Sequence, residues 1–281
     1  MTDRNGVSLA YWGLVLVPLI SLTVFYLYPL SKVLWLSVTV PKPGLGNFAL
    51  LLTSSGIHRI LLTTLRISII TSSIALVLGY LISYVMVHTT PQHRTWILFV
   101  VLLSFWLSVL IRAFAWLTLL QSRGVINTAL LHAGLIDSPL ALVRNEFGVV
   151  LGMVHYMIPY AVLPLYANMK GVDQRLVLAA RGLGASPART FVRIFLSLTT
   201  PGLISAGVLV FIFALGFYIT PALLGGGKTI MLAEYIAVQV NDTLNWGLGA
   251  MLATTLLITV VLLLCLLARF ASLREVFGIK K

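Results

Sequence analysis

One glycine-rich run, Gly225-Gly226-Gly227-Lys228-Thr229, has the residue types of a phosphate-binding loop. In the motif Gly-x4-Gly-Lys-Ser/Thr, backbone N–H groups and the lysine hold the phosphates of a nucleotide, and the loop joins a strand to a helix. The motif requires a glycine where this chain has Ala222, and no strand pattern precedes the run. We therefore expect a flexible turn here and no cofactor bound by this chain.

The histidines and the single cysteine predict no metal site. None of the histidines has the HExxH or cysteine–histidine spacing of zinc sites. With one cysteine, Cys265, the chain cannot form an internal disulfide. No paired nucleophile and base, and no carboxylate pair, stands out either. We therefore expect no catalytic residues and no enzymatic activity.

Arg112 is the charged residue with the sharpest functional interpretation, because it lies inside a long apolar stretch. A charge at membrane depth is costly and faces a cavity or a partner. One interpretation places Arg112, with Trp106 and Trp116, along a translocation path. The alternative is a structural anchor that donates hydrogen bonds to backbone carbonyls of other spans.

Aromatic side chains are the remaining candidates for contact with a transported solute. Arg112 would repel a polycation, and no acidic residue lies clearly inside an apolar stretch. Recognition of a cation would then depend on aromatic faces. For each ring the alternative is packing against lipid or in an interfacial belt. The further candidates for the path are Tyr156, Tyr160, Phe217, Tyr218 and, on the outer side, Glu234.

The composition requires a membrane around these residues. Of the 281 residues, 9% are charged and 59% are hydrophobic, and the mean hydropathy is +1.04. A soluble domain carries about 25% charged residues, so a soluble enzyme is nearly excluded. Backbone polar groups in lipid must be paired, which favours helices. We expect one all-α integral membrane domain over residues 1–281.

Six apolar stretches are long enough to cross ~30 Å of hydrocarbon as helices. The chain carries 19 Lys and Arg against seven Asp and Glu. Basic residues collect in the cytoplasmic loops of membrane proteins, so the surplus does not require a nucleic-acid partner. If both termini are cytoplasmic, eleven Lys and Arg fall on the inner side and five on the outer side, which predicts this orientation. The sequence Tyr26-Leu27-Tyr28-Pro29 is not a small-residue cleavage site, so we interpret the first stretch as a span rather than a signal peptide. The stretches are 11–30, 61–87, 96–120, 149–169, 202–224 and 248–268.

The cytoplasmic loop 170–200 carries the strongest local signals. Asp173 is a plausible N-cap for a helix over 174–181. Gly182 and Gly184 then favour a turn that ends this helix. Ser186-Pro187 predicts the start of a second helix over 188–197, with serine as N-cap and proline at the first helical position.

This loop has two interpretations. Ala179 and Ala180 are small enough to let a partner approach the backbone, and Arg189 and Arg193 share one helix face that suits an acidic partner. The alternative is a basic loop that lies on anionic lipid.

The loop resembles the EAA loop of ABC importer permeases, whose pattern is Glu-Ala-Ala, three residues, Gly, nine residues, then Ile-x-Leu-Pro. Leu178 replaces the glutamate and Ser197 replaces the proline. Five positions are in register: Ala179, Ala180, Gly184, Ile194 and Leu196. Segments 105–116, 124–127, 134–139, 158–160 and 216–228 are similar to the spermidine/putrescine-type permeases.

The resemblance implies a type I ABC importer permease of six transmembrane helices in the bacterial inner membrane. It implies a second homologous permease subunit, two subunits that bind ATP and Mg²⁺, and a periplasmic solute-binding protein. The solute would be a polyamine or a related small organic compound; an opine, an amino-acid-like compound and a stand-alone secondary transporter are the alternatives. The residues implied to contact the ATPase are Leu178, Ala179, Ala180, Arg181, Gly184, Ser186, Pro187 and Arg189.

Overall fold

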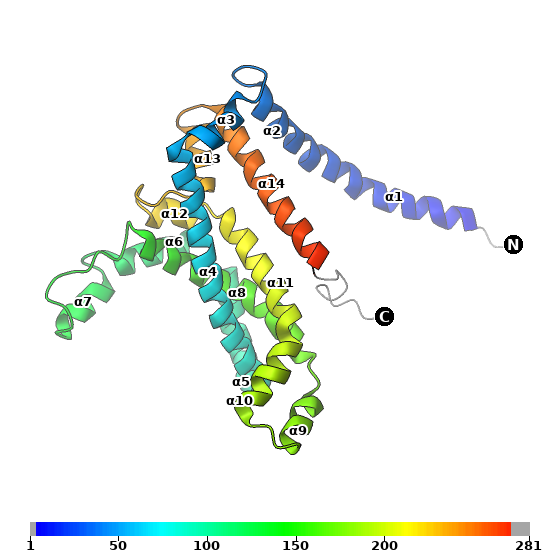
Figure 1. Ribbon diagram of the computed structural model, residues 1–281, viewed down its shortest axis with the longest axis vertical. Coiled ribbons are helices and arrows are strands. Elements are labelled where there is room, and N and C mark those ends of the chain that lie inside the picture. The colour runs from blue at the N-terminus through cyan, green and yellow to red at the C-terminus, as the bar shows by residue number, and fades with distance from the viewer. Residues whose placement is uncertain (1–3, 271–281) are drawn as a thin grey trace. The chain divides into compact units, whose positions relative to one another are not determined.

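The computed structural model describes residues 4–270 and the side chains of residues 12–266 (Figure 1). Every element in this part of the chain is helical. The chain divides into two compact units. The first runs to Ile57 and includes Tyr235–Thr259; the second comprises His58–Glu234 and residues from Val260 onward. The predicted cytoplasmic termini include residues 1–3 and 271–281, which lie outside the described residues.

The first unit contains a long N-terminal helical segment whose side chains are exposed along most of its length. It consists of α1 (Arg4–Leu22), the π-helix η1 (Thr23–Leu27) and α2 (Tyr28–Thr39), followed by α3 (Gly46–Thr53), most of α13 (Leu232–Asn241) and the first part of α14 (Trp246–Phe270). Asn47 Nδ2 donates to the Val40 carbonyl at 2.6 Å. Gly247 also lies against that carbonyl, where a Cβ would come within 2.2 Å of the oxygen. This close approach fixes the start of α14 to the end of α2.

The second unit contains the remaining helices, and its core lies along α8 (Glu146–Lys170). Met153, Met157, Ala161 and Leu165 of α8 are fully buried. Figure 1 shows α8 running alongside α4 and α11. The other helices of this unit are α4 (Ser55–His88), α5 (Pro91–Trp106), α6 (Val109–Leu120), α7 (Val125–His132), α9 (Gln174–Gly182), α10 (Pro187–Thr190), η2 (Phe191–Phe195), α11 (Leu196–Leu215) and α12 (Ile219–Leu224).

Small residues allow the helices of this core to approach closely. A Cβ at Gly79 of α4 would lie 2.7 Å from Ala161 Cβ of α8. At Gly152 of α8, a Cβ would lie 2.7 Å from Thr220 Cγ2 of α12. Association of helices in a bilayer depends on such close packing, because lipid tails are as apolar as the side chains.

We expect Gly79→Val to destabilise the second unit. The added atoms would force α4 away from α8, and overpacking of this kind costs about 1–3 kcal/mol. Thermal unfolding in detergent checks this. Gly207→Val is the matched control, because the nearest atom to its Cβ is the mobile end of Leu76, at 3.4 Å. Equal melting temperatures for the two variants would contradict the close-packing explanation.

Within the described residues, six helical segments are long and apolar enough to cross a membrane, as predicted, but their bounds differ from the prediction. They are Trp12–Thr39, Ser55–His88, Val109–His132, Glu146–Lys170, Pro187–Leu215 and Trp246–Leu266. The chain is thus a multi-pass membrane protein.

The predicted third span, 96–120, is wrong as one continuous helix. α5 ends at Trp106 and α6 begins at Val109, because Leu107 and Ser108 adopt extended ψ angles of 133° and 138°. The break frees the Leu107 carbonyl, and Arg112 Nη2 donates to it at 2.9 Å. An intramembrane cation therefore stabilises an irregular backbone that lipid alone would not tolerate.

The predicted separate helix 188–197 is also wrong, and so is the predicted start of the fifth span at residue 202. Helical structure continues from Pro187 to Leu215 through the π-helix Phe191–Phe195. No glycine stands between Phe195 and Pro201 to end the helix, and the Thr199 and Thr200 hydroxyls donate back to the Phe195 and Leu196 carbonyls of the preceding turn. The span then stops at Gly216, and the short helix α12 follows.

Candidate functional site

The turn between α9 and α10 has the geometry that its sequence predicts. Asp173 Oδ1 accepts a hydrogen bond from Arg175 N at 2.9 Å, which caps the start of α9. At the other end, Ala185 N donates to the Ala180 carbonyl at 3.1 Å and Gly184 N to the Arg181 carbonyl at 2.9 Å. This pair of bonds is the Schellman motif, and it requires a residue in the left-handed region. Gly184 supplies it with φ +84°.

The second half of the turn also follows the prediction. Ser186 Oγ accepts from Arg189 N at 3.4 Å, and Pro187 occupies the first helical position of α10. The local sequence therefore determines both ends of the turn.

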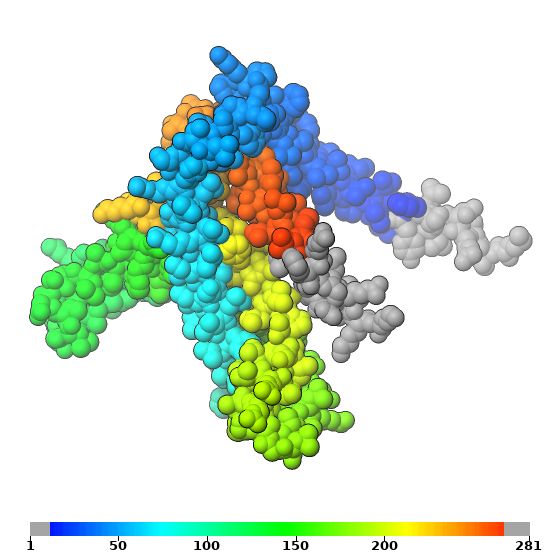
Figure 2. Space-filling model, in the orientation of Figure 1, coloured from blue at the N-terminus to red at the C-terminus, as the bar shows by residue number. Residues whose placement is uncertain are grey.

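The side chains of this turn lie at the surface. Leu178, in the position of the usual glutamate, is 64% exposed, and Leu183 is 90% exposed. Figure 2 shows the segment, in yellow-green, at the far end of the second unit. Large apolar side chains this exposed are typical of residues that a partner covers. Of the predicted contact residues, Ala180 is half-buried and these are exposed: Leu178, Ala179, Arg181, Gly184, Ser186, Pro187 and Arg189.

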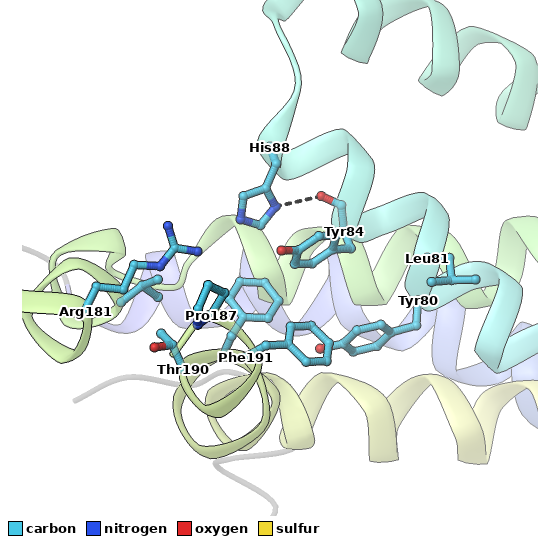
Figure 3. A pocket seen from close by; sticks show the side chains of 10 residues that line it. Tyr80, Leu81, Tyr84, His88, Arg181, Pro187, Thr190 and Phe191 are labelled. Atoms are coloured by element: carbon cyan, nitrogen blue, oxygen red, sulfur yellow. Dashed lines mark hydrogen bonds between the residues drawn. The ribbon is translucent and has the colours of Figure 1, made fainter. Parts of the chain in front are cut away.

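An aromatic cluster joins this turn to the end of α4 (Figure 3). Tyr84 makes edge contacts with Phe191 and Phe195, with ring centroids 5.5 and 5.3 Å apart. His88 packs 5.6 Å from Phe195, and its Nδ1 hydrogen-bonds the Tyr84 carbonyl at 2.8 Å. Edge-to-face pairs contribute about 0.5–1.5 kcal/mol each beyond burial. The turn is thus fixed to the membrane-spanning core through rings rather than through charges.

A second aromatic cluster surrounds Arg112, which is 7% exposed. The guanidinium carbon lies 4.5 Å from the centroid of the Tyr156 ring, a cation–π contact. The Nε and Nη1 atoms are buried without a hydrogen-bond partner among the described residues. Arg112 therefore anchors the break between α5 and α6 through one nitrogen. Within the described chain, its other two nitrogens are unpaired donors beside an aromatic cavity.

The cavity beside Arg112 has a volume of about 220 Å³ and aromatic walls. Tyr156 and Tyr160 stack at 5.4 Å, and their hydroxyls hydrogen-bond at 3.1 Å. Phe217 packs 4.7 Å from Tyr156, and Phe213 packs 4.8 Å from Tyr160. Ring faces and phenol oxygens are groups that bind organic cations.

Trp116 is connected to α8 near the aromatic cavity by a hydrogen bond to His155. Trp116 Nε1 donates to His155 Nδ1 at 3.1 Å, and Ser104 Oγ lies 3.4 Å from His155 Nε2. Because an indole N–H can only donate, Nδ1 accepts, and the proton of the neutral imidazole is assigned to Nε2. The imidazole thereby links α5, α6 and α8.

Three predicted path residues lie apart from the cavity. Trp106 is 85% exposed and Tyr218 is 45% exposed, and neither is in a ring contact among the described residues. Glu234 is 8% exposed, at the start of α13. Burial raises the pKa of its carboxyl, opposed by a hydrogen bond from the Met231 backbone. The structure does bring together Arg112, Trp116, Tyr156, Tyr160 and Phe217.

Three residues at the site were missed by sequence reasoning, namely Phe105, His155 and Phe213. Phe105 packs 5.1 Å from Tyr160. His155 is adjacent to Tyr156 in the sequence, but one step turns α8 by about 100°, so adjacency alone did not place it at the site. Phe105 and Phe213 lie on other helices, and no local signal separates them from lipid-facing phenylalanines.

The glycine run after α12 is a turn, as expected. Gly226 and Gly227 have φ values of +58° and +74°, and a helix rather than a strand precedes them. Among the described residues, no group of three His, Cys, Asp or Glu side chains could hold a metal ion.

Known proteins match the chain over most of its length. It is 34% identical over 215 residues to the spermidine/putrescine transport system permease protein PotB of Escherichia coli (strain K12), which covers 76% of this chain and 78% of the relative. The PotB protein of Haemophilus influenzae is 34% identical over 201 residues, or 72% and 70% of the two chains. The inner membrane ABC transporter permease protein YdcU of E. coli is 27% identical over 242 residues, or 78% and 76%. No protein-family model matches.

Solved structures of ABC transporters share the fold. A chain of a bacterial alginate ABC transporter, in complex with an alginate pentasaccharide-bound periplasmic protein, superposes with a TM-score of 0.77 at 17% identity and covers 96% of both chains. A chain of the inward-facing MetNI methionine ABC transporter gives a TM-score of 0.54 at 18% identity and covers 81% of this chain and 100% of that one. With the fold shared and a third of the aligned residues identical to PotB, the chain belongs to the PotB family of ABC transporter permeases.

Proposed function

We propose that this chain is the permease subunit of an ATP-driven importer that carries a polyamine across the bacterial inner membrane. The observation that supports this most is the 34% identity to spermidine/putrescine permeases over three quarters of the chain. A periplasmic binding protein would deliver the solute, and a second permease would complete the path. Two cytoplasmic subunits would bind ATP and Mg²⁺, since the glycine run of this chain lacks the nucleotide-binding pattern.

The aromatic cavity supports a cationic solute. Tyr156, Tyr160 and Phe217 line a cavity of about 220 Å³ with their rings, and the two tyrosines add hydroxyl groups. Arg112 already covers Tyr156, so a substrate ammonium group would compete with the guanidinium for that ring. Displacement of Arg112 by the solute would break its hydrogen bond to the Leu107 carbonyl and so loosen the α5–α6 break.

Arg112 also favours a second candidate solute. Its unpartnered Nε and Nη1 atoms would bind a carboxylate, as in an opine or an amino-acid-like compound. Competition decides between the two. Excess putrescine should suppress uptake of labelled spermidine by the assembled transporter, whereas suppression by an opine alone would favour the carboxylate.

The surface turn is the proposed contact with the ATPase. Leu178 and Leu183 would enter a groove of that subunit, and Arg189 would pair with acidic residues at its rim. Closure of the ATPases would then tilt α11, because helical structure continues from the turn into that helix. This requires the turn and both termini to lie in the cytoplasm.

Co-purification tests the proposed contact. A tagged chain extracted in mild detergent should retain an ATPase subunit, and Leu183→Asp should lose it, because a charge would be buried without a partner. Leu135→Asp is the matched control, since Leu135 is 71% exposed in the 121–147 segment. If the ATPase never co-purifies with the unmodified chain, the importer function is refuted.

A further inference from the structure

Two cavities in the second unit share a wall on α4. The first, of about 270 Å³, lies between the end of α4 and the turn, and Arg181 and Thr190 line it (Figure 3). The second, of about 380 Å³, runs between α4 and α11. Tyr80 and Leu81 line both. The two cavities therefore adjoin at Tyr80 and Leu81, and together they follow α4 from Ser73 to His88; the pair is called the α4 groove below.

The length of this groove matches one leaflet of a bilayer. Fifteen residue steps along a helix, from Ser73 to His88, cover about 22 Å. A bilayer with its headgroups is about 40–45 Å thick, so one leaflet is about 20–22 Å. The groove thus extends from near the bilayer centre to the headgroup level.

The polarity of the groove changes along this length. Its membrane end is lined by Leu76, Val77, Leu196 and Leu203, with Ser73 as the polar exception. Its other end carries the guanidinium of Arg181, with the hydroxyl of Tyr84 and the imidazole of His88. None of the residues that line either cavity is acidic.

Two groups at the polar end, Arg181 and Thr190, lack a partner within the described chain, whereas His88 bonds the Tyr84 carbonyl. The ion pair found among the described residues joins Arg66 to Glu146, so Arg181 has no carboxylate partner there. Thr190 is 2% exposed and its hydroxyl has no hydrogen-bond partner among these residues. A cationic donor and a buried hydroxyl at the end of an apolar channel suit a phosphate attached to a hydrocarbon chain.

We infer that this groove binds an anionic phospholipid of the inner leaflet. The phosphate would bind Arg181, and an acyl chain would lie between α4 and α11. The inference rests on the proposed function for one point, the assignment of the turn to the cytoplasmic side. A lipid in this position contacts the aromatic cluster of Tyr84 and Phe191, so the anionic lipid content of the membrane would affect how firmly the turn is fixed to α4.

Native mass spectrometry of the full-length protein tests this. The probes are phosphatidylglycerol and phosphatidylcholine, each added to delipidated protein in detergent. Arg181→Gln should lower phosphatidylglycerol retention about tenfold, since a hydrogen bond to a charged group is lost, with little effect on phosphatidylcholine. Arg175→Gln is the matched control, because Arg175 is exposed on the same helix and does not line the groove. Its retention should equal that of the unmodified chain.

A second variant tests the apolar half without changing a charge. Ser73 is exposed and lines that half, so Ser73→Trp should fill it and reduce phosphatidylglycerol retention. Equal retention by the unmodified chain and Arg181→Gln would overturn the inference. If excess inorganic phosphate displaced the lipid, the inference would be overturned in favour of a site for free anions. Loss of retention when the companion permease is bound would overturn it in favour of a subunit interface. The readout needs neither ATP nor transport, so its failure is distinct from failure of the proposed function.

Discussion

Gly184→Val is expected to abolish uptake while the protein remains in the membrane at its normal level. Gly184 has φ +84° at the end of α9, and the left-handed conformation costs an L-residue about 1–2 kcal/mol. For a β-branched residue such as valine, this conformation costs more free energy. Each ~1.4 kcal/mol lowers the population of the correct turn about tenfold, so uptake of labelled spermidine by the assembled transporter should fall at least tenfold.

Two further variants distinguish the effect of the backbone conformation at residue 184 from the effect of a larger side chain. No atom lies within 4 Å of a Cβ at Gly184 or at Gly182, and Gly182 does not have a positive φ. Gly182→Val should therefore retain uptake, and Gly184→Asn should retain part of it, because asparagine tolerates the left-handed region. Normal uptake by Gly184→Val would refute the importance of this turn.

Arg112→Gln is expected to lower the KM for a polyamine about thirtyfold, because it removes a like charge and frees the face of Tyr156 for the substrate. A desolvated cation–π contact contributes ~2 kcal/mol, and each ~1.4 kcal/mol corresponds to a factor of ten. The glutamine amide can still donate to the Leu107 carbonyl and so preserve the α5–α6 break. The measurement is the concentration dependence of uptake. Arg66→Gln is the control; the side chain of Arg66 is 61% exposed in its ion pair with Glu146, and exposed pairs contribute ~1 kcal/mol or less.

The direction of the KM change discriminates between the solute classes. A rise in KM would mean that Arg112 binds a carboxylate, which favours the opine or amino-acid-like solute. An unchanged KM would mean that Arg112 only anchors the break between α5 and α6. Either result would contradict direct competition between Arg112 and a polycation.

The turn could be predicted from the sequence because its determinants are local. Asp173, Gly184 and Ser186 each satisfy or end a helix through neighbours within five residues. The number and length of the apolar stretches likewise predicted six spans. The predicted end of the second helix at residue 197 failed because no stop signal stands there, and the helix continues through residues that suit either a loop or a span.

The aromatic cavity could be predicted only in part, because it depends on packing between distant helices. Trp106 was predicted on the path, yet it is exposed, and its neighbour Phe105 contacts Tyr160 instead. One residue step turns a helix by about 100°, so an error of one position exchanges the inner and outer faces. The rotation of α5 is determined by contacts with α8, which a single sequence does not reveal.

The unbroken path of helical backbone from Pro187 to Leu215 has a mechanical consequence. Its 29 residues form a rod of about 43 Å. One end adjoins the surface turn, and Phe213, near the other end, is part of the aromatic cavity. If such a rod pivots about its midpoint by ~5°, each end sweeps ~2 Å in opposite directions. A displacement of this size would separate packed rings, so a modest swing at the proposed ATPase contact would be sufficient to change the cross-section of the cavity.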